Sequence, residues 1–212
     1  MQSDKTNKIF NFFESLYGPN PRCELNYSND IQLLVAIILS AQCTDKRVNI
    51  VTKDLFKKYT TVADYANAKQ SELEQLIYST GFYRNKAKNI ISMANAVVTC
   101  HNGRIPGDLE QLTNLAGVGR KTASVFLAEY YNKPALAVDT HVGRVARRLG
   151  YTTSKNPVII ERDLAKAFDQ NNWARYHLYM VLFGRYICKS QNPSCNQCRV
   201  KKFCTKPDTC NA

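Results

Sequence analysis

A glycine-rich turn followed at once by two basic residues lies in the stretch LAGVGRKTASVF, residues 115–126. Glycines that lead into a Lys-Thr pair are typical of a loop that binds nucleotide phosphates, but such a loop needs a glycine directly before the lysine. Arg120 occupies that position before Lys121. The spacing therefore excludes an ATP-type loop, and the glycines must serve another purpose.

The same stretch predicts a helix-hairpin-helix motif. A short helix over 109–115, with Asp108 as its N-cap, leads into the tight AGVG turn, and a second helix begins at about Arg120. Gly117 and Gly119 permit positive φ, and without side chains their N–H groups can approach an anion closely. Amides that converge at a helix N-terminus bind phosphate, and in this basic chain a DNA backbone is the best candidate. A plain turn between two helices is the alternative.

Lys121 and Asp139 are the candidate catalytic residues. Lys121 lies in the first turn of the second helix beside Arg120, where the positive helix end favours a neutral, nucleophilic amine. Asp139, in DTHVGRVARRLG, is the expected N-cap of a helix over 140–149, and capping holds a carboxylate rigidly. Taken alone, the position of Lys121 favours a solvated or phosphate-binding lysine, and the position of Asp139 favours a structural cap. Three arginines of the same helix form either a solvated face or part of a DNA-binding surface: Arg144, Arg147 and Arg148.

Four of the eight cysteines follow the pattern C-x6-C-x2-C-x5-C: Cys188, Cys195, Cys198 and Cys204. Four thiolates at these spacings predict a metal site, and the spacing fits either tetrahedral zinc or a [4Fe-4S] cluster. Cys43 and Cys100 lie beside apolar helical stretches, so we expect both to be buried as small hydrophobic side chains.

The composition bounds the class of protein. The 212 residues carry a formal net charge of +12 and are 44% hydrophobic, which allows one domain or two small lobes and favours a nucleic-acid partner. The longest apolar run, LLVAIIL at 33–39, is far shorter than the roughly 20 residues that cross a bilayer, so no membrane partner is expected. The N-terminal MQSDKTNKIF has no apolar signal core, which favours the reducing cytoplasm.

Apolar residues recur at intervals of three and four almost throughout, which predicts an all-α protein. Three of the expected helices have these apolar positions: Ile31, Leu34, Val35 and Ile38 in a helix capped by Asp30; Leu73, Leu76 and Ile77 before a break at Gly81; and Ile90, Ile91, Ala94, Val97 and Val98 in the third.

Four motifs together resemble the endonuclease III family, the bifunctional DNA glycosylases of base-excision repair: LLVAIILSAQCTD, LAGVGRKTA, AVDTHVGRVARRLG and C-x6-C-x2-C-x5-C. The likeness covers about residues 20–205 in the same order and at the same spacings. It implies two helical lobes with a DNA cleft between them. A six-helix barrel over 23–133 would contain the hairpin (about 109–131), and residues 1–22 with 134–212 would hold a [4Fe-4S] cluster on the four cysteines.

The resemblance also implies a substrate and a mechanism. The expected partner is double-stranded DNA that contains a damaged pyrimidine or an abasic site. Separately, a monomer is expected because the sequence shows no exposed heptad and no long apolar stripe, and the lack of a signal core favours the cytoplasm, at the nucleoid. The damaged nucleotide would be flipped out, because its C1′ cannot be reached inside the stack. Lys121 would attack C1′ to expel the base and form a Schiff base, and Asp139 would help to activate the lysine. β-Elimination would then nick the strand 3′ to the lesion.

Two more residues match DNA-contacting positions of the family. Gln42, in SAQ, matches the residue that enters the gap left by the flipped base, and Phe82 matches an apolar wedge that is usually leucine. The other DNA contacts implied by the resemblance are Gly117, Gly119, Arg120, Arg144 and Lys189.

The chain departs from the family at several points. Ala116 replaces the usual proline of the hairpin, Thr80 stands where a larger apolar side chain is common, and Lys189 is the only basic residue between the first two clustered cysteines. The changes at Ala116 and in the cysteine loop predict a less rigid turn and weaker phosphate contacts, and so bear on DNA affinity. His141, next to Asp139, is expected to be a structural histidine rather than an acid or base.

Three alternatives stay open. A glycosylase of the same fold could act on another lesion, such as a pyrimidine photodimer or a mismatch, although the mismatch enzymes typically lack a lysine at the position of Lys121. A non-catalytic DNA-binding module would need no lysine and carboxylate together. An iron-sulfur electron carrier would leave the hairpin and the positive charge unexplained.

Overall fold

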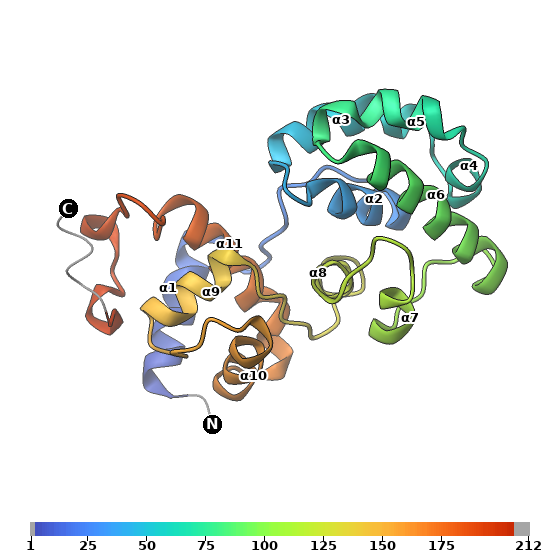
Figure 1. Ribbon diagram of the computed structural model, residues 1–212. Coiled ribbons are helices and arrows are strands. Elements are labelled where there is room, and N and C mark those ends of the chain that lie inside the picture. The colour runs from blue at the N-terminus through green and yellow to red at the C-terminus, as the bar shows by residue number, and fades with distance from the viewer. Residues whose placement is uncertain (1–2, 206–212) are drawn as a thin grey trace. The chain divides into compact units, whose positions relative to one another are not determined.

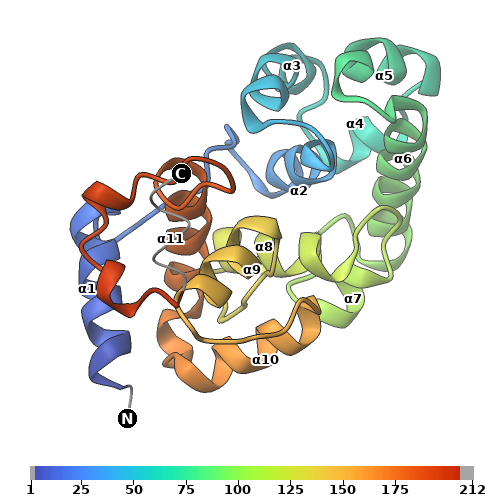
Figure 2. The same cartoon turned by 60° about the vertical axis from the view of Figure 1, so that its left-hand side comes forward.

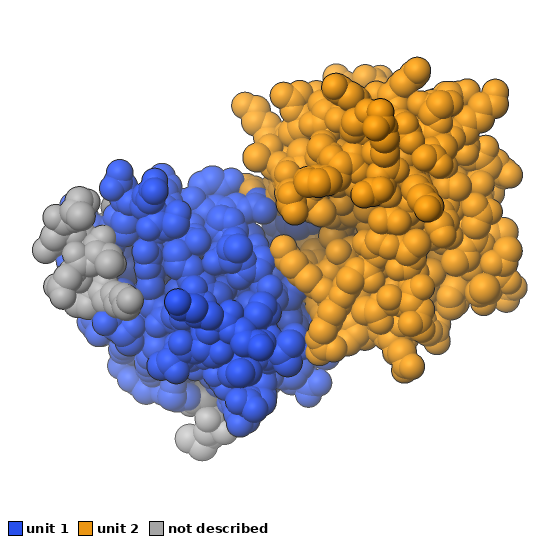
Figure 3. All heavy atoms as spheres, viewed as in Figure 1, with its two compact units in different colours: residues 1–23, 132–212 blue, residues 24–131 orange. Residues whose placement is uncertain are grey.

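A computed structural model of the chain describes residues 3–205, which form helices and connecting loops without a β-strand in that range (Figure 1). The predicted all-α fold class is thereby confirmed. The chain divides into two compact units, residues 24–131 and residues 1–23 with 132–212 (Figure 3). The boundaries implied by the resemblance, 23–133 for the first of these units, lie within two residues of this division. None of the helices over 3–205 combines the length and apolar character needed to cross a membrane.

The unit of residues 24–131 consists of seven α-helices and one 3-10 turn: α2 (Asp30–Ser40), α3 (Asp45–Lys58), α4 (Val62–Ala66), α5 (Gln70–Ile77), η1 (Tyr78–Thr80), α6 (Tyr83–Cys100), α7 (Leu109–Thr113) and α8 (Arg120–Tyr130). Every residue of α2 from Ile31 to Leu39 is buried, so this helix is the centre of the unit and α3, α6 and α8 pack against it. The resemblance implied six helices. The structure has seven, of which α4 and α7 have only five residues each, and α4 is stabilised by a capping box between Thr61 and Asp64.

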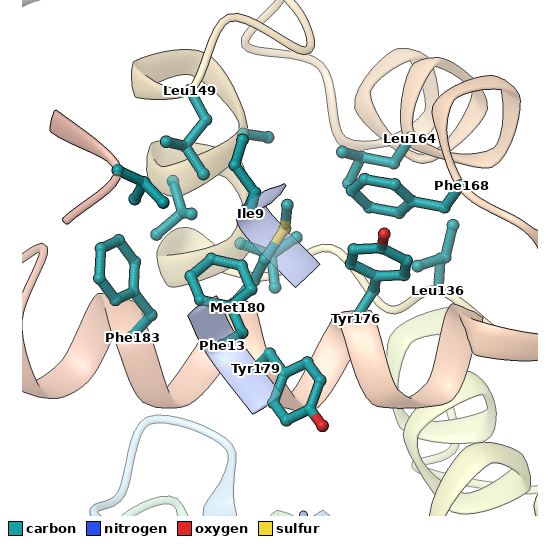
Figure 4. Close-up of a cluster of buried hydrophobic side chains, with 14 of the residues drawn as sticks. Ile9, Phe13, Leu136, Leu149, Leu164, Phe168, Tyr176, Tyr179, Met180 and Phe183 are labelled. Carbon is teal, nitrogen blue, oxygen red and sulfur yellow. The ribbon is translucent and has the colours of Figure 1, made fainter. Parts of the chain in front are cut away.

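The other unit combines the first helix of the chain with the last ones: α1 (Asp4–Tyr17), α9 (Thr140–Arg148), α10 (Pro157–Ala167), η2 (Gln170–Asn172), α11 (Trp173–Tyr186), η3 (Cys195–Gln197) and η4 (Lys201–Phe203). Both α1 and α9 pack on α11, as the two views of the ribbon show (Figure 2). The contact between α1 and α11 is filled by aromatic rings, with Phe13 between Tyr179 and Phe183 at centroid distances of 6.0 and 5.0 Å (Figure 4). Packed rings of this kind fix α1 against α11, and α9, which has Asp139 as its N-cap, packs on the same helix.

Two local predictions need correction. The N-cap of α2 is Asn29, whose Oδ1 accepts from the Gln32 amide at 3.0 Å, and Asp30 is instead the first residue of the helix. On α6, Met93 is buried, whereas Val98 is 42% exposed, so the apolar face is rotated slightly from the expected one.

The two isolated cysteines are also less buried than expected. Cys43 is half-buried in the loop after α2, and Cys100 is exposed at the last residue of α6. Both lie at helix ends, where the helix face no longer points into the core.

Candidate active site

The predicted helix-hairpin-helix is present as α7, a turn and α8, which pack against each other. Asp108 caps α7 as expected, and its Oδ1 accepts from the amides of Glu110 and Gln111 at 2.9 and 3.0 Å. The turn is anchored by Leu115 and Val118, which are both buried. These two buried side chains therefore anchor the turn, while Gly117 and Gly119 are exposed at the surface.

The two glycines of the turn have different conformations. Gly117 has a φ of 76°, and a Cβ there would lie 2.8 Å from Cβ of Asn89 on α6, so both backbone and space require glycine. Gly119 has a φ of −79°, and nothing lies within 4 Å of the Cβ that another residue would add. Gly117 thus adopts the positive φ that glycine permits, whereas Gly119 does not, and its lack of a side chain keeps the surface open.

Lys121 and Arg120 are both exposed in the first turn of α8. Gly119 is the N-cap of this helix, and among the described residues no side chain caps its first turn. The first amides of an α-helix have no partner within the helix, and together with the helix dipole they attract an anion. The hairpin thus offers amides for a phosphate and places a lysine amine directly beside them.

Asp139 is the N-cap of α9, as predicted. Its Oδ1 accepts from the Val142 amide at 2.8 Å, and the residue is half-buried. Leu136 and Ala137, just before it, are buried and fix the path of the chain into the helix. Asp139 belongs to the unit of 1–23 and 132–212, whereas Lys121 belongs to the unit of 24–131.

His141 has a structural environment. Its Nδ1 lies 3.2 Å from Nη2 of Arg144, and its Cβ would lie 2.9 Å from a Cβ added at Gly184 of α11. The close approach of α9 to α11 therefore depends on glycine at 184, and His141 lies in that contact. This agrees with the structural role expected for His141.

Arg144, predicted to contact DNA, directs its guanidinium into the protein. Its Nε donates to the main-chain oxygen of Cys188 at 2.9 Å and its Nη2 to that of Gly184 at 2.8 Å. Burial lowers the pKa of Arg144. These contacts favour a structural role in which Arg144 binds the C-terminal end of α11 to α9, and a DNA contact by Arg144 stays a prediction.

The sequence presents Arg148 only as one of three arginines on the same helix, whereas the structure gives it specific contacts. Its Nη1 donates to the main-chain oxygen of Lys189 at 2.6 Å and to Sγ of Cys188 at 3.3 Å. Arg148 thus links the end of α9 to both the sulfur and the following backbone of the first clustered cysteine. The side chain of Lys189 itself is exposed.

The four clustered cysteines line one small cavity together with apolar side chains that include Leu149, Phe183 and Ile187. Within residues 3–205 no three ligand-type side chains are grouped so that they could hold a metal ion as they stand. Cys195 is disulfide-bonded, whereas Cys188, Cys198 and Cys204 are free thiols. The donor set and its apolar walls fit a sulfur-ligated cluster, and ligation by Cys195 requires that its disulfide be reduced.

Gln42 and Phe82 are exposed on two loops of the unit of residues 24–131. Both have positive φ without being glycine, 55° for Gln42 and 49° for Phe82. Phe82 is 64% exposed, which is unusual for a phenylalanine and suits a wedge that enters a base stack. Thr80, in contrast, is buried, and its Oγ1 donates to the Ile77 carbonyl at 2.8 Å.

Comparison with known proteins defines the class first. The family model described as HhH-GPD superfamily base excision DNA repair protein matches residues 35–170, a range that includes the hairpin, Lys121 and Asp139. The fold and the hairpin therefore define a helix-hairpin-helix protein of base-excision repair.

Individual relatives then give the family. Endonuclease III of Rickettsia felis is 42% identical over 204 residues, which cover 96% of this chain and 95% of that protein. A solved non-covalent endonuclease III–DNA complex has a TM-score of 0.91 at 41% identity and covers 98% of this chain and 97% of its own. A trapped endonuclease III–DNA covalent intermediate has a TM-score of 0.89 at 42% identity and covers 98% of both chains. The chain belongs to the endonuclease III family.

Proposed function

We propose that the protein removes oxidised pyrimidines of the thymine glycol type from duplex DNA and then nicks the strand 3′ to the abasic site. The observation that carries the proposal is the exposed Lys121, which follows directly on a glycine-lined, uncapped helix start. The trapped covalent intermediate of a relative 42% identical to this chain supports a covalent step with DNA.

The proposed reaction uses Lys121 as the nucleophile. Its Nζ forms a bond to C1′ while the bond from C1′ to the base breaks, and the base leaves with the electron pair and takes up a proton. Opening of the sugar ring gives an imine between Nζ and C1′. Loss of a proton from C2′ then expels the 3′ phosphate, and water hydrolyses the imine and frees the lysine.

Asp139 has two parts in this scheme. It accepts the proton that Lys121 must lose before it attacks, and its negative charge stabilises the positive charge that develops on the sugar. The hydrogen bond from the Val142 amide to Oδ1 fixes the direction of the carboxylate. A carboxylate held in place by a helix start needs no rearrangement during the reaction.

The DNA partner is supported by the hairpin and by the charge of the chain. The open amides of α8 and the exposed Arg120 are suited to a phosphate, and the net charge of +12 attracts the duplex without reading its sequence. Gln42 and Phe82 would fill the space that a flipped nucleotide leaves.

Borohydride trapping on a duplex with one thymine glycol tests the proposal, because borohydride reduces an imine to a stable covalent complex. We expect a trapped complex with the wild type and none with Lys121→Ala or Lys121→Arg. The arginine variant is the matched control, since it keeps the positive charge for DNA binding and lacks the nucleophilic amine.

A wild type that binds the duplex and never traps would contradict the oxidised-pyrimidine assignment. A lesion panel with photodimers and mismatches then tests the alternative of a glycosylase of the same fold with another lesion range. Failure to trap on an abasic duplex as well would exclude the imine mechanism itself.

We also propose that the cysteine cavity holds a [4Fe-4S] cluster on Cys188, Cys195, Cys198 and Cys204. In support, the four cysteines line one apolar cavity and Arg148 donates to a ligand sulfur. When bound, the cluster would be a structural link between α11 and the C-terminal loop. Protein purified without oxygen should contain about four iron and four sulfide per chain. Stoichiometric zinc without sulfide would support the zinc alternative instead.

Two further proposals concern the oligomeric state and the cellular location of the protein. The protein is expected to act as a monomer, which sedimentation with and without duplex DNA would test. It is expected to act in the cytoplasm, at the nucleoid, because cysteines that ligate metal must stay reduced. Cell fractionation and imaging of a tagged chain would test that location.

A further inference from the structure

Lys86, on α6, is only 5% exposed, although lysine is almost never buried so deeply. Its Nζ donates to the main-chain oxygens of Leu39 and Thr80, each at 2.8 Å. Burial lowers the pKa of Lys86, while the nearby Cys43 raises it. A buried ammonium group is tolerated only where fixed acceptors replace its water, and here two carbonyl groups from distant parts of the chain do so.

The two carbonyl groups belong to the loops that carry the candidate DNA-inserting residues. Leu39 lies in the last turn of α2, three residues before Gln42, and Thr80 ends η1, two residues before Phe82. Gln42 and Phe82 both have left-handed backbone, which a non-glycine residue keeps only where its surroundings hold it. Lys86 therefore bonds to the chain just before each of the two.

We propose that Lys86 is a positioning residue, which ties the two loops together so that Gln42 and Phe82 enter the duplex as one preset pair. The inference rests on the proposed function, since the pair matters only if a nucleotide leaves the stack. Side chains that are held in place before DNA arrives avoid the ordering cost that otherwise opposes binding. Lys86 is too deeply buried to reach DNA itself, so it acts through the two loops.

The chemistry of lysine suits this position. The last carbonyls of a helix have no donor within it and lie at the negative end of the dipole, which describes the carbonyl of Leu39 in α2. An ammonium group has three donors and can serve both carbonyls at once. Methionine would fill a similar space and leave both carbonyls without this donor.

The test uses Lys86→Met and a duplex that reports insertion without chemistry. The duplex carries a tetrahydrofuran abasic analogue, which cannot form an imine, opposite 2-aminopurine, whose fluorescence rises when the base is unstacked. We expect Lys86→Met to lose about tenfold in preference for this duplex over an undamaged one and to lose the fluorescence rise. Its affinity for undamaged DNA should stay within about twofold, because backbone phosphate contacts determine that binding.

Val97→Ala is the matched control. Val97 is fully buried on the same helix, three turns further from the two loops, so this variant loses stability without affecting the loops. Thermal unfolding shows that both variants fold, and Val97→Ala should keep the fluorescence rise. If Lys86→Met keeps it equally well, the inference is wrong.

A double-mutant cycle excludes a merely structural role. In a Gln42→Ala, Phe82→Ala background, Lys86→Met should cause almost no further loss of preference for the abasic duplex, because the pair that it positions is gone. A further loss as large as in the wild-type background would overturn the inference. Processing of a thymine glycol duplex by the wild type is scored separately, so failure of the proposed function is distinguished from failure of this inference.

Discussion

The first turns of α8 and α9 are built in opposite ways, although each carries a candidate catalytic residue. α9 begins with Asp139, whose side chain accepts from the amide of Val142. α8 begins after Gly119, and within the described residues no side chain caps its first turn. A capped helix start uses its amides to hold a side chain, whereas an open one keeps them for an anion. The same structural element thus fixes a carboxylate in one unit and, over the part of the chain that the structure describes, keeps its first amides without a side-chain cap in the other.

The largest effect is expected on the reaction rate, when Asp139 at the capped start of α9 loses its carboxylate. Asp139→Asn keeps an equally good cap and Asp139→Gly removes it, yet both should lower the single-turnover rate on a thymine glycol duplex by about 100- to 10,000-fold. The free energy of unfolding should stay unchanged for Asp139→Asn and fall by a few tenths of a kcal/mol, about 0.3, for Asp139→Gly. Rapid-quench kinetics and urea titration measure the two quantities. If Asp139→Asn reacts at the wild-type rate, Asp139 serves only as a helix cap and has no catalytic role.

A smaller effect is expected at the turn that precedes the open start. Gly117→Ala must accept a φ of 76° and a Cβ 2.8 Å from Cβ of Asn89, so it should lower the free energy of unfolding by about 2 kcal/mol. Gly119→Ala is the control, since its φ of −79° suits alanine and its Cβ meets nothing within 4 Å. Urea unfolding of both variants compares them. Equal stabilities would mean that the turn relaxes without cost.

Features that depend on neighbouring residues were predictable from the sequence. Asp108 and Asp139 were identified as caps because a cap contacts amides two or three residues ahead. The error between Asn29 and Asp30 arose because adjacent side chains of nearly equal capping ability cannot be ranked by pattern alone. Glycine permits positive φ without requiring it, so the sequence does not tell which of Gly117 and Gly119 adopts that conformation.

Features that depend on distant chain segments could not be predicted in this way. The hydrogen bonds of Arg144 could not be foreseen, because its acceptors belong to residues 184 and 188, which only folding brings to α9. Lys86 was missed because a lysine on a helix is usually solvated. A signal was nevertheless present, since Lys86 stands four residues before Ile90 and eight before Ala94, on the apolar side of α6.

The smallest effect, on stability and on DNA affinity, is expected when the open start of α8 is given a capping side chain at residue 119. Gly119→Asp should cap α8 and raise the free energy of unfolding by about 0.5 kcal/mol, because an acid at a helix start is favourable there. It should also lower affinity for undamaged duplex by about tenfold at low salt, since the carboxylate occupies the amides and repels phosphate. Gly119→Ser separates the two causes, because it caps without charge and should lose less affinity. Fluorescence anisotropy over a salt series measures the binding. Unchanged affinity in Gly119→Asp would mean that phosphate does not bind at these amides, and the contrast between α8 and α9 would then concern helix stability alone.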